Sequence, residues 1–230
     1  MPWVYDAQGI FRVIYMKKKM DVKKLVLLAM LSALSFVAVA TIRIPVVEFL
    51  KYEPKDVIIT IGGFLFGPPS AAIISILVGL VEMLTISDTG PIGCLMNILS
   101  SCSFACTAAI IYKKRHTHAG ALWGLLSGTV LTVGIMLLWN WLITPLYLGY
   151  PRQAVEQMLV PVFLPFNLLK GGINSSLVML LYKPLTNALR KARLLPPASA
   201  PSKSRIGVIV LALAVLATCT LFILALQGII

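Results

Sequence analysis

The sequence predicts an all-α protein that crosses a membrane several times, and three observations support this fold class. Of the 230 residues, 59% are apolar and only 12% are charged, whereas a soluble domain has about half and about a quarter. The mean hydropathy is +0.93, and the apolar residues form blocks close to the ~20 residues that cross a bilayer. The basic residues lie in short segments between these blocks. We therefore expect a six-helix body followed by an additional C-terminal transmembrane helix.

The first three predicted spans are unequal in length. The first covers residues 24–42, an apolar run that begins after consecutive lysines. The second covers residues 56–66, contains Gly62-Gly63, and is too short to cross alone. The Gly67-Pro68-Pro69 turn then leads directly into the third span, residues 70–86. Short, Gly-interrupted membrane segments often border a binding cavity, because irregular backbone must be satisfied by protein or water.

The remaining spans are longer, and each has a recognisable boundary. The fourth covers residues 92–112 and starts in the sequence Gly-Pro-Ile-Gly, whereas the fifth, residues 121–143, follows a basic loop. The sixth covers residues 161–182 and combines apolar side chains with amides and a lysine. The seventh, residues 206–230, is almost entirely apolar. Residues 161–182 therefore stand out as the span that carries polar groups.

These spans imply four parts of the chain. Residues 1–21 form a cytoplasmic leader without the uninterrupted apolar core of a cleavable signal. Residues 22–190 form the six-helix membrane domain. Residues 191–205 are rich in Pro, Ser and basic residues and are predicted to be a cytoplasmic linker. Residues 206–230 form the extra transmembrane helix.

The distribution of Lys and Arg predicts the orientation in the cell membrane. With a cytoplasmic N-terminus, the four outside basic residues are Arg43, Lys51, Lys55 and Arg152, and only Lys170 lies inside a span. The inside segments then hold the other 15 of the 20: Arg12, Lys17, Lys18, Lys19, Lys23, Lys24, Lys113, Lys114, Arg115, Lys183, Arg190, Lys191, Arg193, Lys203 and Arg205. This excess follows the positive-inside rule. Seven spans then place the C-terminus outside.

One face of the sixth span is polar. Asn167, Lys170 and Asn174 are spaced three and four residues apart, which places them on the same side of a helix. A charge in mid-membrane costs at least ~2.5–3.5 kcal/mol, so it should face a cavity or a partner. One interpretation is a hydrogen-bonded staple between helices, with Glu82 paired to Lys170. The other is a ligand site in the outer half of this helix.

Two more amides are predicted to lie near the same side of the membrane. Asn97 comes just inside the start of the fourth span, and Asn140 lies between Trp139 and Trp141 near the end of the fifth. Amides offer donors and acceptors together, and aromatic rings offer stacking surfaces. The set suits a planar, largely uncharged heteroaromatic ligand. The two tryptophans are equally well explained as residues of the membrane interface.

Several function classes are disfavoured. The net charge of +12 does not indicate a nucleic-acid partner, because the basic residues flank apolar runs and form no soluble basic face. The spans contain no nucleophile–base–orienter set, and no Walker A motif occurs, so we expect no enzyme. His116 and His118 lie in a basic loop without acidic neighbours, so we expect no metal site and no cofactor. The four cysteines are expected to be small apolar core residues.

The first span also carries small residues at helical spacing. Ala29 and Ala33 are four positions apart, and such a pair lets two helix backbones approach closely. The pattern favours packing within the protein over a surface for docking another membrane protein.

The order of these segments resembles the substrate-binding S components of energy-coupling factor (ECF) vitamin transporters, and in particular the riboflavin-specific RibU group. The matching stretches are Phe49-Leu50-Lys51-Tyr52-Glu53-Pro54-Lys55-Asp56-Val57, Gly90-Pro91-Ile92-Gly93 with Asn97, Asn140 with Leu142 and Pro145, and Leu164-Pro165-Phe166-Asn167-Leu168-Leu169-Lys170-Gly171. The resemblance covers roughly residues 22–190, and the last stretch is its most specific part. Members usually end after six spans, so residues 206–230 depart from the pattern.

The resemblance implies a function and a site. Such proteins bind a vitamin from outside, here riboflavin as the transported ligand, with FMN as a second candidate. The pocket is built from the loop after the first helix, which contains Leu50 and Tyr52, and from the outer halves of the fourth to sixth helices, which contain Asn97, Asn140, Asn167 and Lys170. The isoalloxazine ring is expected to meet Asn140, Asn167 and Lys170. Ala29 and Ala33 would dock a membrane-embedded T component, and two ATPase subunits would supply the energy.

Three alternatives remain at this point. An S component for another vitamin would keep the fold, although cationic thiamine is disfavoured by Lys170. A membrane-embedded enzyme would need paired carboxylates or a His–metal set within the spans. A structural membrane protein would leave the convergence of three amides and a lysine unexplained.

Overall fold

The structure is a computed structural model that describes residues 22–47, 50–87, 89–149, 151–195 and 206–226. Its main elements are α2 (Val22–Thr41), β1 (Ile44–Val47), β2 (Leu50–Tyr52), α3 (Lys55–Phe66), α4 (Pro68–Thr85), α5 (Gly90–Lys114), α6 (His118–Leu142), α7 (Thr144–Leu148), α8 (Arg152–Met158), the π-helix η1 (Leu159–Phe163), α9 (Leu164–Lys191) and α10 (Ile206–Leu226). The predicted leader and residues 196–205 of the predicted linker lie outside the described residues.

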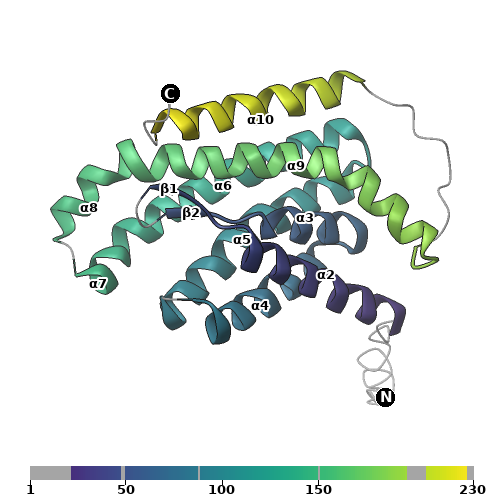
Figure 1. Cartoon of the computed structure of the whole chain (residues 1–230), viewed down its shortest axis with the longest axis horizontal. Helices are drawn as coiled ribbons and strands as arrows, with labels where there is room; N and C mark the ends of the chain where they lie inside the picture. The colour runs from purple at the N-terminus through teal and green to yellow at the C-terminus, as the bar shows by residue number, and fades with distance from the viewer. Residues whose placement is uncertain (1–21, 48–49, 88, 150, 196–205, 227–230) are drawn as a thin grey trace, which may run out of the picture.

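The predicted all-α membrane architecture is confirmed, because the described chain is a bundle of long helices (Figure 1). Five described helical segments are long and apolar enough to cross a membrane: Val22–Thr41, Pro68–Thr85, Gly90–Lys114, His118–Leu146 and Ile206–Leu224. The two other predicted spans correspond to α3, which is 12 residues long, and to α9, which carries the polar face. Both are embedded among the apolar helices, so each depends on its neighbours for its place in the membrane.

The short helix α3 lies at the centre of the bundle, against α2, α4, α5 and α9. Its glycines explain how it fits there. A Cβ at Gly63 would lie 3.0 Å from the Cβ of Ala71 and 3.1 Å from that of Ala109, so the absence of a side chain lets α3 approach α4 and α5 closely. Gly67 then turns the chain into α4 with a φ of +91°, a left-handed conformation that favours glycine.

A two-stranded antiparallel hairpin, β1–β2, follows α2, and the sequence pattern did not predict it. Ile44 pairs with Tyr52 across the hairpin. Val46 and Tyr52 pack against Phe166 and other apolar side chains of α9. The hairpin is therefore attached to the polar helix α9 and can serve as a wall for a cavity beside it.

The polar helix α9 is preceded without interruption by the π-helical turn η1 and by α8. The sixth predicted span, residues 161–182, therefore begins inside η1 and ends well before the helix does. The helix continues to Lys191 because its last turns are amphipathic and carry Arg190 and Lys191. The turn η1 brings Phe163 to full burial just before the residues of the polar face.

The additional helix α10 packs along α9, with a minor contact to β1 (Figure 1). It covers residues 206–226 of the predicted 206–230 span. Ala212 and Ile223 are buried on the α9 side, whereas Val210 and Leu221 are more than half exposed. The outer face of α10 therefore suits contact with lipid acyl chains.

Candidate substrate-binding site

A cavity of about 330 Å³ lies between the hairpin, α4, α5, α6, η1 and α9. Its volume falls within the range of small-molecule pockets. Five of the six predicted ligand-binding residues line it, and they come from four different elements: Leu50, Asn97, Asn140, Asn167 and Lys170. The sixth, Tyr52, is not among the lining residues. The fold thus brings together residues that lie up to 120 positions apart (170 minus 50) in the sequence.

Asn140 and Asn167 are held in similar ways on facing helices. The amide of Asn140 donates to the carbonyl of Met136 at 2.7 Å, and its oxygen accepts from Thr144 Oγ1 at 2.9 Å. The amide of Asn167 donates to the carbonyl of Phe163 at 2.8 Å. Each side chain therefore has a fixed rotamer and retains hydrogen-bonding capacity toward the cavity. Both are about 95% buried.

Lys170 forms an ion pair that sequence reasoning missed. Its Nζ lies 3.1 Å from Asp56 Oδ2 and 3.4 Å from Ser100 Oγ. Asp56 is 1% exposed and also accepts a hydrogen bond from Ser101. The considered pairing of Lys170 with Glu82 is wrong, because Asp56 at the start of α3 lies against α9 whereas Glu82 binds a different lysine.

Asn174 points into the protein and away from the cavity lining. Its Nδ2 donates to Asp56 Oδ2 at 3.4 Å, and its Oδ1 accepts from the Tyr52 hydroxyl at 2.9 Å. Burial, together with the negative charge of Asp56, raises the pKa of Tyr52 above its ordinary value, so the phenol stays protonated and donates. The polar face of α9 is therefore divided: Asn167 and Lys170 line the cavity, whereas Asn174 joins α9 to α3 and the hairpin.

A second charged network also borders the cavity. Lys55 Nζ lies 2.6 Å from Glu82 Oε2 and 2.9 Å from Glu53 Oε2. Asn97 Nδ2 donates to the same Glu82 oxygen at 3.0 Å, and Arg43 lies 3.5 Å from Glu53. Sequence reasoning noted Glu82 in its span but not these partners, because residues from the hairpin, α3 and α4 meet only in the fold.

Glu82 carries an unusual atom for a buried side chain. It is 2% exposed and lines the cavity, yet its Oε1 has no hydrogen-bond partner among the described residues. A buried acceptor without a donor costs about 1–3 kcal/mol, and more when it is charged. A ligand with hydroxyl groups in this part of the cavity would supply the missing donor.

The small residues of α2 face outward. Ala29 and Ala33 are exposed, beside Val26 and Val37, which are about half exposed. The buried side of α2 is instead formed by larger residues such as Leu28 and Leu31. The alanine pair therefore does not pack against other described helices of this chain. Its face is available to another membrane helix.

Within the described residues, no group of three or more His, Cys, Asp or Glu side chains is arranged to hold a metal ion. Lys55 and Lys170 beside the cavity are instead paired with carboxylates. The arrangement is that of a binding cavity with fixed amide donors and acceptors.

Comparison with known proteins gives a consistent family assignment. The family model described as "ECF transporter, substrate-specific component" matches residues 23–182. The riboflavin transporter RibU of Staphylococcus aureus is 31% identical over 178 residues, which cover 74% of this chain and 93% of that protein. RibU of Streptococcus thermophilus is 30% identical over 183 residues, covering 74% and 86%. A solved S component of a bacterial ECF transporter matches with a TM-score of 0.62 at 31% identity, covering 73% of this chain and 98% of that one.

Proposed function

Because the chain belongs to the family of substrate-specific components of ECF transporters, we propose that it is the riboflavin-binding membrane subunit of a vitamin importer. The family supplies the architecture, and its riboflavin-transporting relatives suggest the substrate. The cavity itself supplies the chemical reasons for choosing riboflavin over another vitamin.

The observation that carries the proposal is the convergence of Asn140, Asn167 and Lys170 on one cavity. The pyrimidine-dione edge of an isoalloxazine ring presents acceptor, donor and acceptor in turn. Two amides and an ammonium group can form hydrogen bonds with such an edge, because amides both donate and accept. Phe163 and Phe166 line the same cavity and offer aromatic surface to the ring.

The other polar groups of the cavity suit the ribityl chain. Glu82 has a buried carboxylate oxygen that no donor reaches among the described residues, and Asn97 and Ser100 line the same cavity. A polyol carries several hydroxyl groups, each of which can donate one hydrogen bond and accept others. The combination of a planar imide-like edge and a polyol is what distinguishes riboflavin from thiamine or biotin. A site built for these groups rejects ligands that lack them, because its polar groups would stay unpaired.

FMN is a second candidate ligand. Arg43 and Lys51 line the cavity near the hairpin, and Lys51 is exposed. These cations could receive a terminal phosphate on the ribityl chain.

The coupling partners and the orientation are part of the same proposal. The exposed face of α2 with Ala29 and Ala33 would dock a membrane-embedded T component, and two ATPase subunits would drive release. The excess of basic residues at the ends of α5 and α9 supports a cytoplasmic location for those ends. The N-terminus would then be cytoplasmic, the substrate cavity would open outward, and the C-terminus would lie outside.

Titration of the purified protein with riboflavin tests the proposal. We expect riboflavin fluorescence to be quenched with a stoichiometry of about one, since the ring would lie against aromatic side chains. FMN, thiamine and biotin serve as comparison ligands in a thermal-shift assay. A thermal shift with thiamine or biotin, together with unchanged riboflavin fluorescence, would contradict the substrate assignment.

A further inference from the structure

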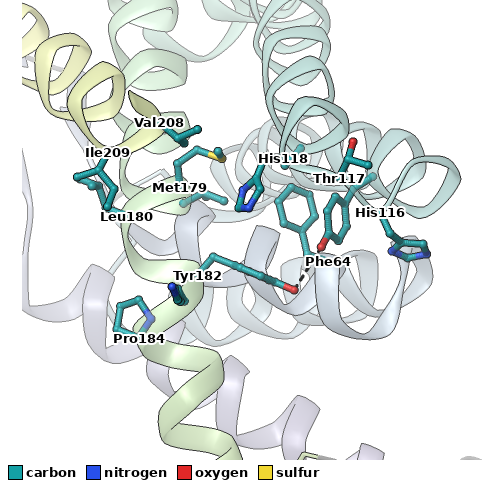
Figure 2. A pocket seen from close by; sticks show the side chains of 14 residues that line it. Phe64, His116, Thr117, His118, Met179, Leu180, Tyr182, Pro184, Val208 and Ile209 are labelled. Carbon is teal, nitrogen blue, oxygen red and sulfur yellow. Dashed lines mark hydrogen bonds between the residues drawn. The ribbon is translucent and has the colours of Figure 1, made fainter. Parts of the chain in front are cut away.

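A second cavity, of about 390 Å³, lies at the end of the bundle where α9 carries its basic residues (Figure 2). It shares no lining residue with the substrate cavity. Figure 2 shows Val208 and Ile209 of α10 on one side of it, with Phe64, His116 and Thr117 on the other. The wall from α10 lies outside the residues matched by the family model, 23–182.

The polar part of this cavity carries the positive charge of Lys183 and no acidic lining residue. Lys183 lines it together with His116 and His118, which provide an ammonium group and imidazole N–H donors. None of the eight acidic residues in the sequence lies within residues 112–121, 178–195 or 206–209, which contribute all the described lining residues except Phe64. The first backbone N–H groups of α6, which begins at His118, add a positive partial charge. An anionic group is therefore the complementary ligand.

Aromatic hydroxyls line the same region. The rings of Phe64 and Tyr112 stack with centroids 4.4 Å apart. The hydroxyl groups of Tyr112 and Tyr182 lie 3.4 Å apart, as the dashed line in Figure 2 marks. Tyrosines at this depth fit the membrane interface, where one end of the ring is apolar and the other can bond to a polar headgroup.

The remaining lining is apolar and leads to the surface that contacts lipid. Met179 and Leu180 of α9 face Val208 and Ile209 of α10. Ile209 is 43% exposed, and the neighbouring Val210 is 58% exposed. An acyl chain can therefore run along the junction of α9 and α10 while its headgroup remains at the cations. A free phosphate compound would leave this apolar surface uncovered.

We propose that this cavity binds one anionic phospholipid, with its headgroup among the lining residues Lys183, His116 and His118 and an acyl chain between α9 and α10. Basic pockets between transmembrane helices on the cytoplasmic side are suited to anionic headgroups. The lipid would fill the space between α10 and the six-helix body and so hold the extra helix in place.

Native mass spectrometry of the full chain in mild detergent tests the proposal, with dioleoylphosphatidylglycerol and dioleoylphosphatidylcholine as probes. These lipids share their acyl chains and differ in headgroup charge. We expect one phosphatidylglycerol to bind at least about tenfold more tightly than phosphatidylcholine, since only its headgroup carries a net negative charge. Equal affinity for the two lipids would overturn the proposal.

In a triple variant, His116→Gln/His118→Gln/Lys183→Gln, the ratio of the affinity for phosphatidylglycerol to that for phosphatidylcholine should fall to near one. Lys191→Gln is the matched control: it removes the same formal charge, taking histidine as neutral, from the same helix end, but Lys191 does not line the cavity. This control should keep the preference for phosphatidylglycerol. An equal loss in both variants would mean that only the general surface charge attracts lipid, and it would overturn a defined site. Unchanged riboflavin binding would verify that both variants are folded.

Glycerol 3-phosphate separates a lipid site from a site for free phosphate compounds. It carries the phosphate of the lipid but has no acyl chain. We expect it to displace phosphatidylglycerol at least about tenfold less effectively than the lipid displaces itself. Equal displacement would assign the cavity to a soluble phosphate ligand and overturn the proposal. Val208→Trp fills the apolar part of the cavity. It should weaken the binding of phosphatidylglycerol but not that of glycerol 3-phosphate.

Discussion

At the scale of single residues, the ion pair of Lys170 with Asp56 gives Lys170 a structural role beside its place in the cavity. Asp56 is 1% exposed, and its carboxylate has few routes to water. Removal of one partner from a buried pair leaves an uncompensated charge, which costs about 3–5 kcal/mol. The lysine therefore cannot be tested as a ligand group without regard to its partner.

Lys170→Met is expected to lower the melting temperature of the empty protein, because Asp56 loses its counter-charge. The double variant Lys170→Met/Asp56→Asn should recover most of that loss while riboflavin binding stays weak. Thermal melting without ligand, followed by riboflavin titration, measures both effects. If Lys170→Met alone melts like the wild type, Asp56 does not depend on this lysine.

Asn167→Leu should behave differently. Within the described residues its hydrogen bond runs to the carbonyl of Phe163, four positions earlier in the chain, so the substitution strands no group of a distant element. We expect the empty protein to keep its melting temperature, whereas riboflavin affinity falls at least tenfold, or by at least about 1.4 kcal/mol. Asn187→Leu, near the C-terminal end of α9 and exposed, is the control and should bind riboflavin normally. A large drop in empty-state melting would indicate that Asn167 holds helices together.

At the scale of elements, the glycines of α3 determine how closely it packs. Gly63→Val would force side-chain atoms against Ala71 and Ala109, on α4 and α5, where even a single Cβ is tight. Such overpacking costs about 1–3 kcal/mol. Gly134→Val is a matched control, because a Cβ there meets no atom within 4 Å. The melting temperature should fall only for Gly63→Val. Equal melting temperatures of the two variants would argue against close packing of α3.

The exposed face of α2 predicts a separation of binding from transport. Ala29→Trp should block uptake and assembly with the coupling subunits, because a large side chain prevents close helix approach. Riboflavin binding by the isolated chain should remain, since Ala29 is exposed and does not line the cavity. Leu34→Trp, on an exposed flank of the same helix, is the control. A parallel loss of binding in Ala29→Trp would show that the face is needed within this chain.

The apolar elements were predictable from the sequence, but their partners were not. The second and fifth predicted spans, 56–66 and 121–143, agree with α3 and α6 to within a few residues. Hydrophobic blocks identify such segments because the bilayer sets their length. The hairpin was missed, since strands of three and four residues that include Pro45 carry no clear alternating pattern.

The site was predictable in part for a similar reason. Asn140, Asn167 and Lys170 are polar residues in apolar runs, so each is conspicuous in the sequence. The contacts of Asp56 and Glu82 with lysines cannot be recognised in the sequence, because pairing between distant segments depends on how helices pack. A single sequence shows which groups need partners but does not show which partners they find.

At the scale of the whole molecule, the charge asymmetry predicts which end faces the cytoplasm. Lys51 of the hairpin and Lys191 of α9 are both exposed and are predicted to lie on opposite sides of the membrane. In a background without the four native cysteines, Lys51→Cys should react with a membrane-impermeant maleimide on intact cells. Lys191→Cys should react only after the membrane is opened. Labelling of Lys191→Cys on intact cells would reverse the proposed orientation.

The pairing of α3 with α9 also has a consequence for how the protein is made. The helix α3 is too short to cross alone, α9 carries a charge in its membrane part, and neither is among the five described segments that qualify as spans by length and hydropathy. More than a hundred residues separate Asp56 from Lys170. During synthesis we therefore expect Asp56 to lack its Lys170 partner until the ribosome has delivered α9. We expect chains truncated before α9 to be recognised as incomplete and degraded, so biogenesis is completed only after α9 has been inserted.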